Sequence, residues 1–281
     1  MSKVAVVTDS TAYLPKDLVD QYQIPVAPLV VIWGEETLRD DIDITPTAFY
    51  ERLKTAKVMP STSQPPVPEF ENIFRQLHED GYEILAILIS ALLSGTIASA
   101  EQAKLNIPEA TIEIFDSQST AMALGFQVLA ATRAAEAGAS LSECVAVAEK
   151  ARQNSGVVFA VDTLEFLHRG GRIGGGARYL GTALQLKPLL TIEEGKIEAL
   201  DRVRTKKKAH ERLSDIVVER VGGKPNIRLA TLNANAVEDA NALLENTSKR
   251  LNVVEKIFSE VSPVIGTHVG PGTVGLAYVH D

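Results

Sequence analysis

Short apolar runs alternate with helical patterns through the first half of this chain. The runs at residues 4–7, 84–89 and 111–115 have the length and branched side chains of buried strands. The last two are each followed by a small-residue turn and a helical pattern, the order that parallel crossover units require. The sequence therefore predicts an α/β fold built on a parallel sheet.

Local signals indicate where several elements begin. A helix is expected near residues 15–22 and a strand near residues 26–32. Thr45 and Pro46 are typical of an N-cap and first helical position, and Ser140 with Glu143 forms a capping box. The buried stripe of a further helix is marked by Phe70, Ile73, Phe74 and Leu77.

The length of 281 residues favours two domains with a cleft between them. Near residues 157–161 a new strand begins, and a glycine-rich stretch and a hairpin turning at Glu194-Gly195 follow. We place the boundary at Ser155, which gives domains of residues 1–154 and 155–281. A ligand is expected in the cleft.

The charge balance excludes some classes of partner. Lys and Arg total 28 against 36 Asp and Glu, and a net charge of −8 disfavours a general binder of nucleic acid or anionic membranes. No apolar stretch approaches the length of a membrane span, so a cytoplasmic protein without membrane insertion is expected. The single cysteine, Cys144, shares an apolar helical stripe and is interpreted as a core residue.

Polar turns follow four predicted strands, at the positions where open parallel sheets bind ligands. They are Thr8-Asp9-Ser10, Ser94-Gly95-Thr96, Asp116-Ser117 and Thr231-Leu232-Asn233. The second is the most informative, because Gly95 allows close backbone approach and a helix beginning there directs free N–H groups at an anion. An ordinary helix cap is the alternative interpretation.

Two other segments carry candidate ligand contacts. Residues 61–66 form a hydroxyl-rich loop that prolines stiffen, suited to presenting Thr62 and Gln64, although a solvated linker would have the same composition. His268 lies in a Gly/Pro-rich turn between apolar stretches, where neither helix nor strand packing explains it. We favour a ligand contact there over a structural histidine.

Familiar cofactor motifs are absent from the sequence. The glycine-rich residues 167–176 do not close a Gly-x-Gly-x-x-Gly pattern, and Gly223-Lys224 lacks the upstream glycine of a Walker motif. The five histidines never fall at zinc-site spacing, so neither metal nor cofactor is expected. Residues 202–212 are basic, which indicates either a phosphate or partner contact or a solvated helix face.

A hydrolase is the enzymatic alternative. Ser94, His268 and Asp116 are the residue types of a catalytic triad, but the chain has no Gly-x-Ser-x-Gly elbow. We keep a serine hydrolase of acyl esters as the second hypothesis.

Together the motifs resemble those of the DegV family, bacterial fatty-acid-binding proteins that serve as the substrate-presenting subunit of fatty acid kinase. Each motif alone is weak, but the set is specific and extends from end to end of the chain. It consists of Thr8-Asp9-Ser10, Ser61-Thr62-Ser63-Gln64-Pro65, Leu93-Ser94-Gly95-Thr96, Asp116-Ser117, Gly170-Gly171-Arg172-Ile173, Lys187-Pro188, Arg204 and His268 with Gly270-Pro271-Gly272. One departure is Ile97, where an aromatic residue is common in the family.

The resemblance implies an N-terminal three-layer α/β/α domain with a parallel sheet and a C-terminal two-layer α/β domain with a mixed sheet. It implies an acyl tunnel with the carboxylate near the interdomain cleft. Carried over by motif, Thr62 and Ser94, with the adjoining Gly95 and Thr96, hydrogen-bond the carboxylate, and His268 joins that network.

The resemblance also implies a partner. Arg172 and Arg204 are expected to face phosphate or the kinase, a separate dihydroxyacetone-kinase-like ATP-binding subunit. The chain itself would be a non-enzymatic carrier that presents a long-chain fatty acid for phosphorylation to acyl phosphate. An effector-sensing regulatory protein is a third hypothesis, which predicts a ligand without a kinase.

Overall fold

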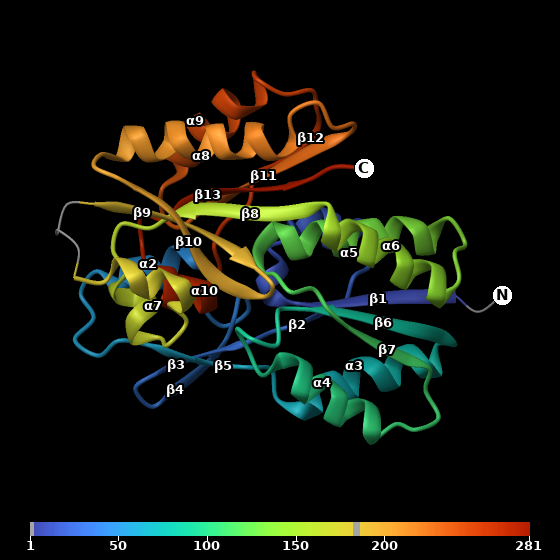
Figure 1. The fold of residues 1–281 in the computed structure, drawn as a ribbon. Helices are drawn as coiled ribbons and strands as arrows, with labels where there is room; N and C mark the ends of the chain where they lie inside the picture. Colours follow the sequence, from blue (N-terminus) through green and yellow to red (C-terminus); the bar gives the residue numbers. More distant parts are fainter. Residues whose placement is uncertain (1–2, 182–185) are drawn as a thin grey trace.

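The computed structural model describes residues 3–181 and 186–281, which form two main sheets and one small sheet (Figure 1). The first is parallel, in the order β2 (Val26–Ala27), β1 (Lys3–Asp9), β6 (Tyr82–Leu88), β7 (Ile112–Asp116). The second is mixed, in the order β10 (Lys196–Val203), β9 (Lys187–Glu193), β8 (Ser155–Ala160), β13 (Val274–Val279), β11 (Ile227–Asn233), β12 (Val253–Ile257). The small antiparallel sheet has the order β4 (Glu36–Arg39), β3 (Val30–Trp33), β5 (Ser61–Ser63).

Helices cover these sheets in layers. Figure 1 shows α3 (Val67–Glu79) and α4 (Thr96–Leu105) on one face of the parallel sheet and α5 (Ala121–Glu136) and α6 (Leu141–Gln153) on the other. The outer face of the mixed sheet carries α8 (Lys206–Val221) and α9 (Val237–Ser248). The remaining helices are η1 (Ser10–Ala12), α1 (Lys16–Tyr22), α2 (Pro46–Leu53), α7 (Glu165–Arg169), η2 (Gly174–Tyr179) and α10 (Pro263–Val269). The predicted α/β architecture is confirmed.

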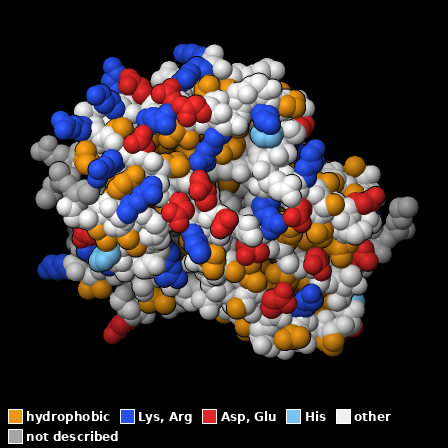
Figure 2. Space-filling view, in the orientation of Figure 1, with side chains coloured by type: hydrophobic (Ala, Val, Ile, Leu, Met, Phe, Trp, Pro, Cys, Tyr) orange, Lys and Arg blue, Asp and Glu red, His pale blue; other side chains and the backbone are white. Residues whose placement is uncertain are grey.

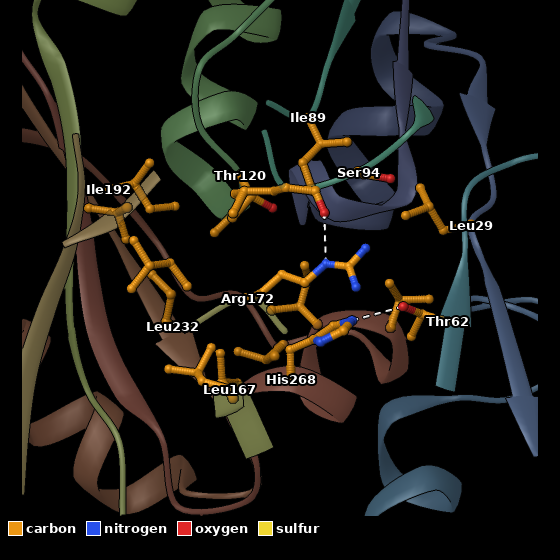
Figure 3. A pocket seen from close by; sticks show the side chains of 18 of the residues that line it. Leu29, Thr62, Ile89, Ser94, Thr120, Leu167, Arg172, Ile192, Leu232 and His268 are labelled. Atoms are coloured by element: carbon orange, nitrogen blue, oxygen red, sulfur yellow. Dashed lines mark hydrogen bonds between the residues drawn. The ribbon is translucent and has the colours of Figure 1, made fainter. Parts of the chain in front are cut away.

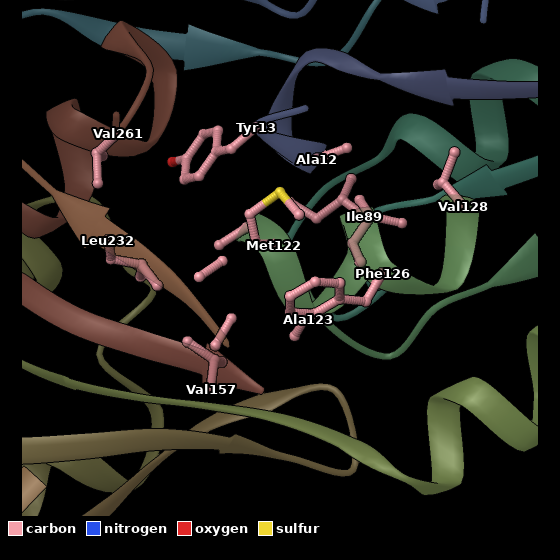
Figure 4. Packing of buried hydrophobic residues seen from close by; sticks show 14 of the residues in the cluster. Ala12, Tyr13, Ile89, Met122, Ala123, Phe126, Val128, Val157, Leu232 and Val261 are labelled. Atoms are coloured by element: carbon pink, nitrogen blue, oxygen red, sulfur yellow. The ribbon is translucent and has the colours of Figure 1, made fainter. Parts of the chain in front are cut away.

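Helix α5 is shared by both sheets. Eleven of its 16 residues are buried, because it packs against β1 of the parallel sheet and against β8 and β13 of the mixed sheet. In Figure 4, Met122 and Phe126 of α5 lie among side chains from both halves, including Tyr13, Val157 and Leu232. Strand β8 begins at Ser155, but one hydrophobic cluster spans that position, and the domain boundary there stays a prediction.

Several local predictions are confirmed. Thr45 accepts a hydrogen bond from the Ala48 amide, and the capping box of Ser140 and Glu143 is present. The hairpin turns at Glu194 and Gly195, whose φ angles of 49° and 78° are those that a tight two-residue turn requires. Cys144 is fully buried. Within the described ranges, no helix combines the length and apolar character needed to cross a bilayer.

Three expectations were wrong. The single strand at residues 26–32 is two strands in different sheets, because Pro28 lacks an N–H and interrupts the ladder. The loop at residues 61–66 begins as β5, which pairs Thr62 with Val31 and completes the small sheet. His268 lies in the last turn of α10, which Pro263 opens and Gly270, with φ of 76°, ends.

The buried carboxylate of Asp9 fixes the carboxyl ends of β1 and β6. It accepts hydrogen bonds from the Thr11 amide (2.9 Å), the Thr11 hydroxyl (2.6 Å) and the Ile89 amide (2.7 Å). Burial raises its pKa, and these hydrogen bonds oppose that rise. Because Ile89 also lines the pocket described below, Asp9 connects the sheet to the site.

We expect Asp9→Ala to destabilise the protein by about 3 kcal/mol, because it leaves buried donors without an acceptor. Urea unfolding followed by circular dichroism measures this change. Asp17→Ala, at an exposed position of α1, is the matched control and should change stability by less than about 0.5 kcal/mol. Equal effects of the two substitutions would contradict the structural role of Asp9.

Candidate ligand-binding site

A pocket lies between the two main sheets at the N-terminus of α5, where Thr120 and Ala121 form part of its wall. About 810 Å³ of its space, including the open mouth, is free of protein atoms. Most of the wall is apolar. The apolar side chains are those of Leu29, Ile89, Leu93, Ala121, Val157, Phe159, Leu167, Ile192, Ile197, Leu232, Val261, Val264, Ile265 and Val269.

Polar side chains from distant parts of the chain meet in this pocket (Figure 3). Thr62 comes from β5, Ser94 from the turn before α4, and His268 from α10. Arg172, in the segment after α7, projects between them. The structure therefore brings together the three residues that the sequence singled out, with Arg172 added to them.

His268 is held in a neutral, oriented state. Its Nε2 atom lies 2.8 Å from the hydroxyl of Thr62, whereas its buried Nδ1 atom has no hydrogen-bond partner among the described residues. Burial, and secondarily the charge of Arg172, lower the pKa of His268 to about 4. Gly170 makes room for the ring, because a Cβ there would lie 2.1 Å from Nδ1.

Ser94 lies in the pocket wall, whereas Gly95 and Thr96, which follow it, do not line the pocket. Its hydroxyl is 2.9 Å from that of Thr96, which is fully buried and opens α4. Gly95 lies against the side chain of Gln64, where a Cβ would come within 3.1 Å. No side chain in the described part of the chain caps α4, so its first amides remain available at this end of the helix. Of the predicted turn, Ser94 is the residue that reaches the pocket.

Arg172 is partly committed to the backbone. Its Nε atom donates to the Leu93 carbonyl at 3.1 Å, and one terminal nitrogen donates to the Gly170 carbonyl at 2.8 Å. The sequence placed Arg172 toward phosphate or a partner, and the structure puts its guanidinium in the wall beside Thr62 and His268. Its second terminal nitrogen has no hydrogen bond to the described residues and can bind an anion.

Arg204 lies outside this pocket, exposed between β10 and α8. Other charges of the basic run are paired: Lys206 with Asp239, and Arg212 with Asp201 at 3.2 Å. Figure 2 likewise shows Lys and Arg side chains interspersed with Asp and Glu over the region of β9, β10 and α8. Most of residues 202–212 thus form a solvated surface, which is the second of the two interpretations of this basic run.

The triad of the hydrolase hypothesis is not assembled. Asp116 accepts hydrogen bonds from the amides of Gln118 (2.8 Å) and Ala91 (3.4 Å), while Ser94 contacts Thr96 and His268 contacts Thr62. No hydrogen bond joins Ser94, His268 and Asp116 to one another in the described part of the chain. Residues 3–181 and 186–281 contain no group of three or more His, Cys, Asp or Glu side chains placed to hold a metal ion.

Sequence reasoning missed Thr120 and Ala121. The available signal was the Asp116-Ser117 turn, which leads into α5, but the backbone there could not be anticipated, because Ala121 has a φ of 55° that alanine rarely adopts. Ile97, the departure from the family pattern, packs on the outer side of the parallel sheet against α3 and does not line the pocket.

Comparison with known proteins extends these observations. Residues 3–281 match the model of a family described as "Uncharacterised protein, DegV family". A DegV domain-containing protein of Clostridium perfringens is 36% identical over 99% of both chains, and protein DegV of Bacillus subtilis is 35% identical over 98% of both.

Solved structures agree with this result. A DegV family protein from Thermus thermophilus, described as binding fatty acid, superposes with a TM-score of 0.92 at 37% identity, over 99% of this chain and 100% of its own. DegV from Bacillus subtilis, described as a fatty acid binding protein, superposes with a TM-score of 0.91 at 34% identity over both whole chains. The chain belongs to the DegV family.

Proposed function

We propose that this protein binds a long-chain fatty acid with its carboxylate at Thr62, Ser94 and His268, and presents it to a separate ATP-binding kinase in the cytoplasm. The observation that carries the proposal is a single pocket whose wall is largely apolar and whose hydroxyl, imidazole and guanidinium groups converge in one region. The fatty-acid binding of two relatives above 30% identity supports the same ligand class.

The tail and the head group would contribute differently to affinity. A chain of about 14 methylenes at ~0.8 kcal/mol each offers on the order of 11 kcal/mol of gross burial energy. A carboxylate loses hydration on entering the pocket, so its polar contacts have to offset that loss and fix its orientation. The apolar wall therefore accounts for binding strength, and the polar group accounts for which end of the ligand faces the mouth.

The hydrogen-bond pattern suits a carboxylate. His268 is neutral near pH 7, because its pKa is lowered to about 4. If its Nε2–H donates to the Thr62 oxygen, 2.8 Å away, the Thr62 hydroxyl hydrogen is free to donate to the ligand. The Ser94 hydroxyl supplies a second donor, and Arg172 adds positive charge without forming a bidentate clamp, since its other nitrogens hold backbone carbonyls.

These hydrogen bonds leave lone pairs on the carboxylate oxygens that can attack a phosphorus atom. In the proposed reaction, a carboxylate oxygen attacks the γ-phosphorus of ATP held by the kinase, the bond to the β-phosphate oxygen breaks, and ADP leaves as the acyl phosphate forms. The exposed side chain of Arg172 would face the transferred phosphoryl group, and Arg204 would contact the kinase. The sequence has no Walker motif, which is why we assign ATP binding to the partner.

Filling the tail region should weaken binding. We expect Ile192→Trp to weaken fatty-acid affinity at least about tenfold, because the indole occupies the space of the acyl chain. Native mass spectrometry and titration of delipidated protein with a fluorescent fatty acid measure the loss. Val254→Trp, at an exposed position of β12, is the control, and a wild-type protein that takes up no fatty acid would refute the proposal.

The head-group assignment predicts selectivity between an acid and its ester. Ser94→Ala removes one donor to a charged oxygen and should weaken binding of a fatty acid about tenfold, while leaving its methyl ester within about twofold. Isothermal titration of both ligands gives the two ratios. Ser61→Ala, exposed on β5, is the matched control. Equal losses for acid and ester would show that Ser94 does not contact the carboxylate.

A substitution of Arg204 should impair presentation of the fatty acid to the kinase without changing the binding of the fatty acid. We expect Arg204→Ala to lower kinase-dependent phosphorylation about tenfold, because it removes a charge at the proposed interface, with fatty-acid affinity unchanged. Hydroxylamine trapping of the acyl phosphate, with a dihydroxyacetone-kinase-like subunit and ATP, measures the transfer. Lys224→Ala removes an exposed positive charge elsewhere and should leave transfer intact. Normal transfer by Arg204→Ala would remove Arg204 from the interface.

A further inference from the structure

Asp40 is a buried carboxylate outside the pocket that bonds to two parts of its wall. The side chain is 1% exposed, and one oxygen accepts a hydrogen bond from the backbone N–H of Val264, at the start of α10, at 3.0 Å. The other oxygen accepts from the Ser10 hydroxyl at 2.7 Å, and that hydroxyl in turn accepts from the Leu29 amide at 3.1 Å. Val264 and Leu29 both line the pocket.

Helix α10 comes from the C-terminal part of the chain, yet it is held by residues from the first 62 positions. Asp40 binds its first turn, and Thr62 contacts His268 in its last turn. Between them, the ring of Tyr50 lies against Gly266, where a Cβ would come within 2.6 Å of the phenol oxygen. Val264 and His268 are four residues apart and so lie on the same face of the helix. The position of His268 therefore depends on how Asp40 holds Val264.

The groups that act on Asp40 are acidic or neutral, and Lys16, which lines the same cavity, is paired with Asp20 at 2.8 Å. Asp41 contributes negative charge to Asp40, Glu260 acts on Asp41 and Tyr50, Tyr13 approaches from the residue after η1 and Tyr50 from α2, and no ion pair reaches Asp40 within the described ranges. Burial and then Asp41 raise the pKa of Asp40 to about 7, and the nearby hydroxyls of Ser10 and Ser262 oppose the rise. Burial also raises the pKa of Asp41, to about 6, so these two carboxyl groups titrate together near neutral pH.

We propose that Asp40 is a positioning residue that holds α10, and with it His268 and the apolar wall, so that ligand affinity depends on this carboxyl group. The part that concerns ligand affinity rests on the fatty-acid binding proposed above. The part that concerns His268 does not, because the contacts of Asp40 exist in the protein without a ligand.

The test uses the ring signals of His268 in the delipidated, full-length protein, followed by NMR between pH 6 and 8 and assigned with His268→Gln. His268 itself does not titrate in this range, since its pKa is about 4. We expect its signals to shift with a midpoint near 7 in the wild type and to stay constant in Asp40→Asn. Asp41→Asn should lower the midpoint, because it removes a negative charge, and Ser10→Ala should raise it, because it removes a hydrogen bond to the carboxylate.

Affinity supplies the second readout. Asp40→Ala should weaken fatty-acid binding about tenfold, because it leaves the Val264 amide unsatisfied, whereas Asp40→Asn keeps an oxygen for that amide and should stay within about threefold. A His268 shift that persists unchanged in Asp40→Asn would overturn the positioning role. So would an Asp40→Ala protein with unaltered His268 signals and affinity.

The proposed function and the proposed role of Asp40 can be refuted independently of each other. If the wild type takes up no fatty acid, the proposed function fails, and the pH profile of His268 in Asp40→Asn still decides the role of Asp40. If Asp40→Ala does not fold, the opposite midpoint shifts expected for Asp41→Asn and Ser10→Ala carry the test. Midpoints that do not move in those two variants would count against the proposal.

Discussion

The packing of α5 between two sheets is the constraint on which the rest of the molecule depends. Because most of the helix is buried, it needs cover from β1 of the parallel sheet, from β8 and β13 of the mixed sheet and from α6, and it lies between the two sheets. The pocket begins at the first residue of α5, Ala121, and its wall includes Val157, Leu232 and Ile192 of the mixed sheet. The pocket is therefore a consequence of where a buried helix begins.

The polar side of that space is assembled from the ends of elements. Ser94 precedes α4, and His268 lies on α10. Thr62 lies in the pocket because β5 pairs with β3. Ser94 contacts the Thr96 hydroxyl, Thr62 lies in a paired strand and contacts His268, and His268 is buried, so little freedom remains to be lost when a ligand binds. The low pKa of His268 follows from the same burial and leaves Arg172 as the cationic group of the cluster.

The strands and helices of the parallel sheet could be predicted because their apolar patterns are strong and local. The predictions that failed concern residues 26–32, 61–66 and 268, where short segments take their structure from partners far away in sequence. Nothing near Thr62 indicates that Val31 will pair with it, and nothing near His268 indicates that Tyr50 and Asp40 will hold its helix. The motifs pointed to Thr62, Ser94 and His268, and only the tertiary contacts show how these side chains are oriented.

In the proposed binding mode, helix α10 joins recognition of the acyl tail to recognition of the head group. It contributes Val264, Ile265 and Val269 to the apolar wall and His268 to the polar cluster, within seven residues. A short helix moves as a unit, since its backbone hydrogen bonds resist internal change. Any displacement of α10 that widened the pocket would therefore also change the position of the imidazole relative to Thr62. In the proposed binding mode, filling of the tail region and orientation of the carboxylate are thus physically coupled through one helix.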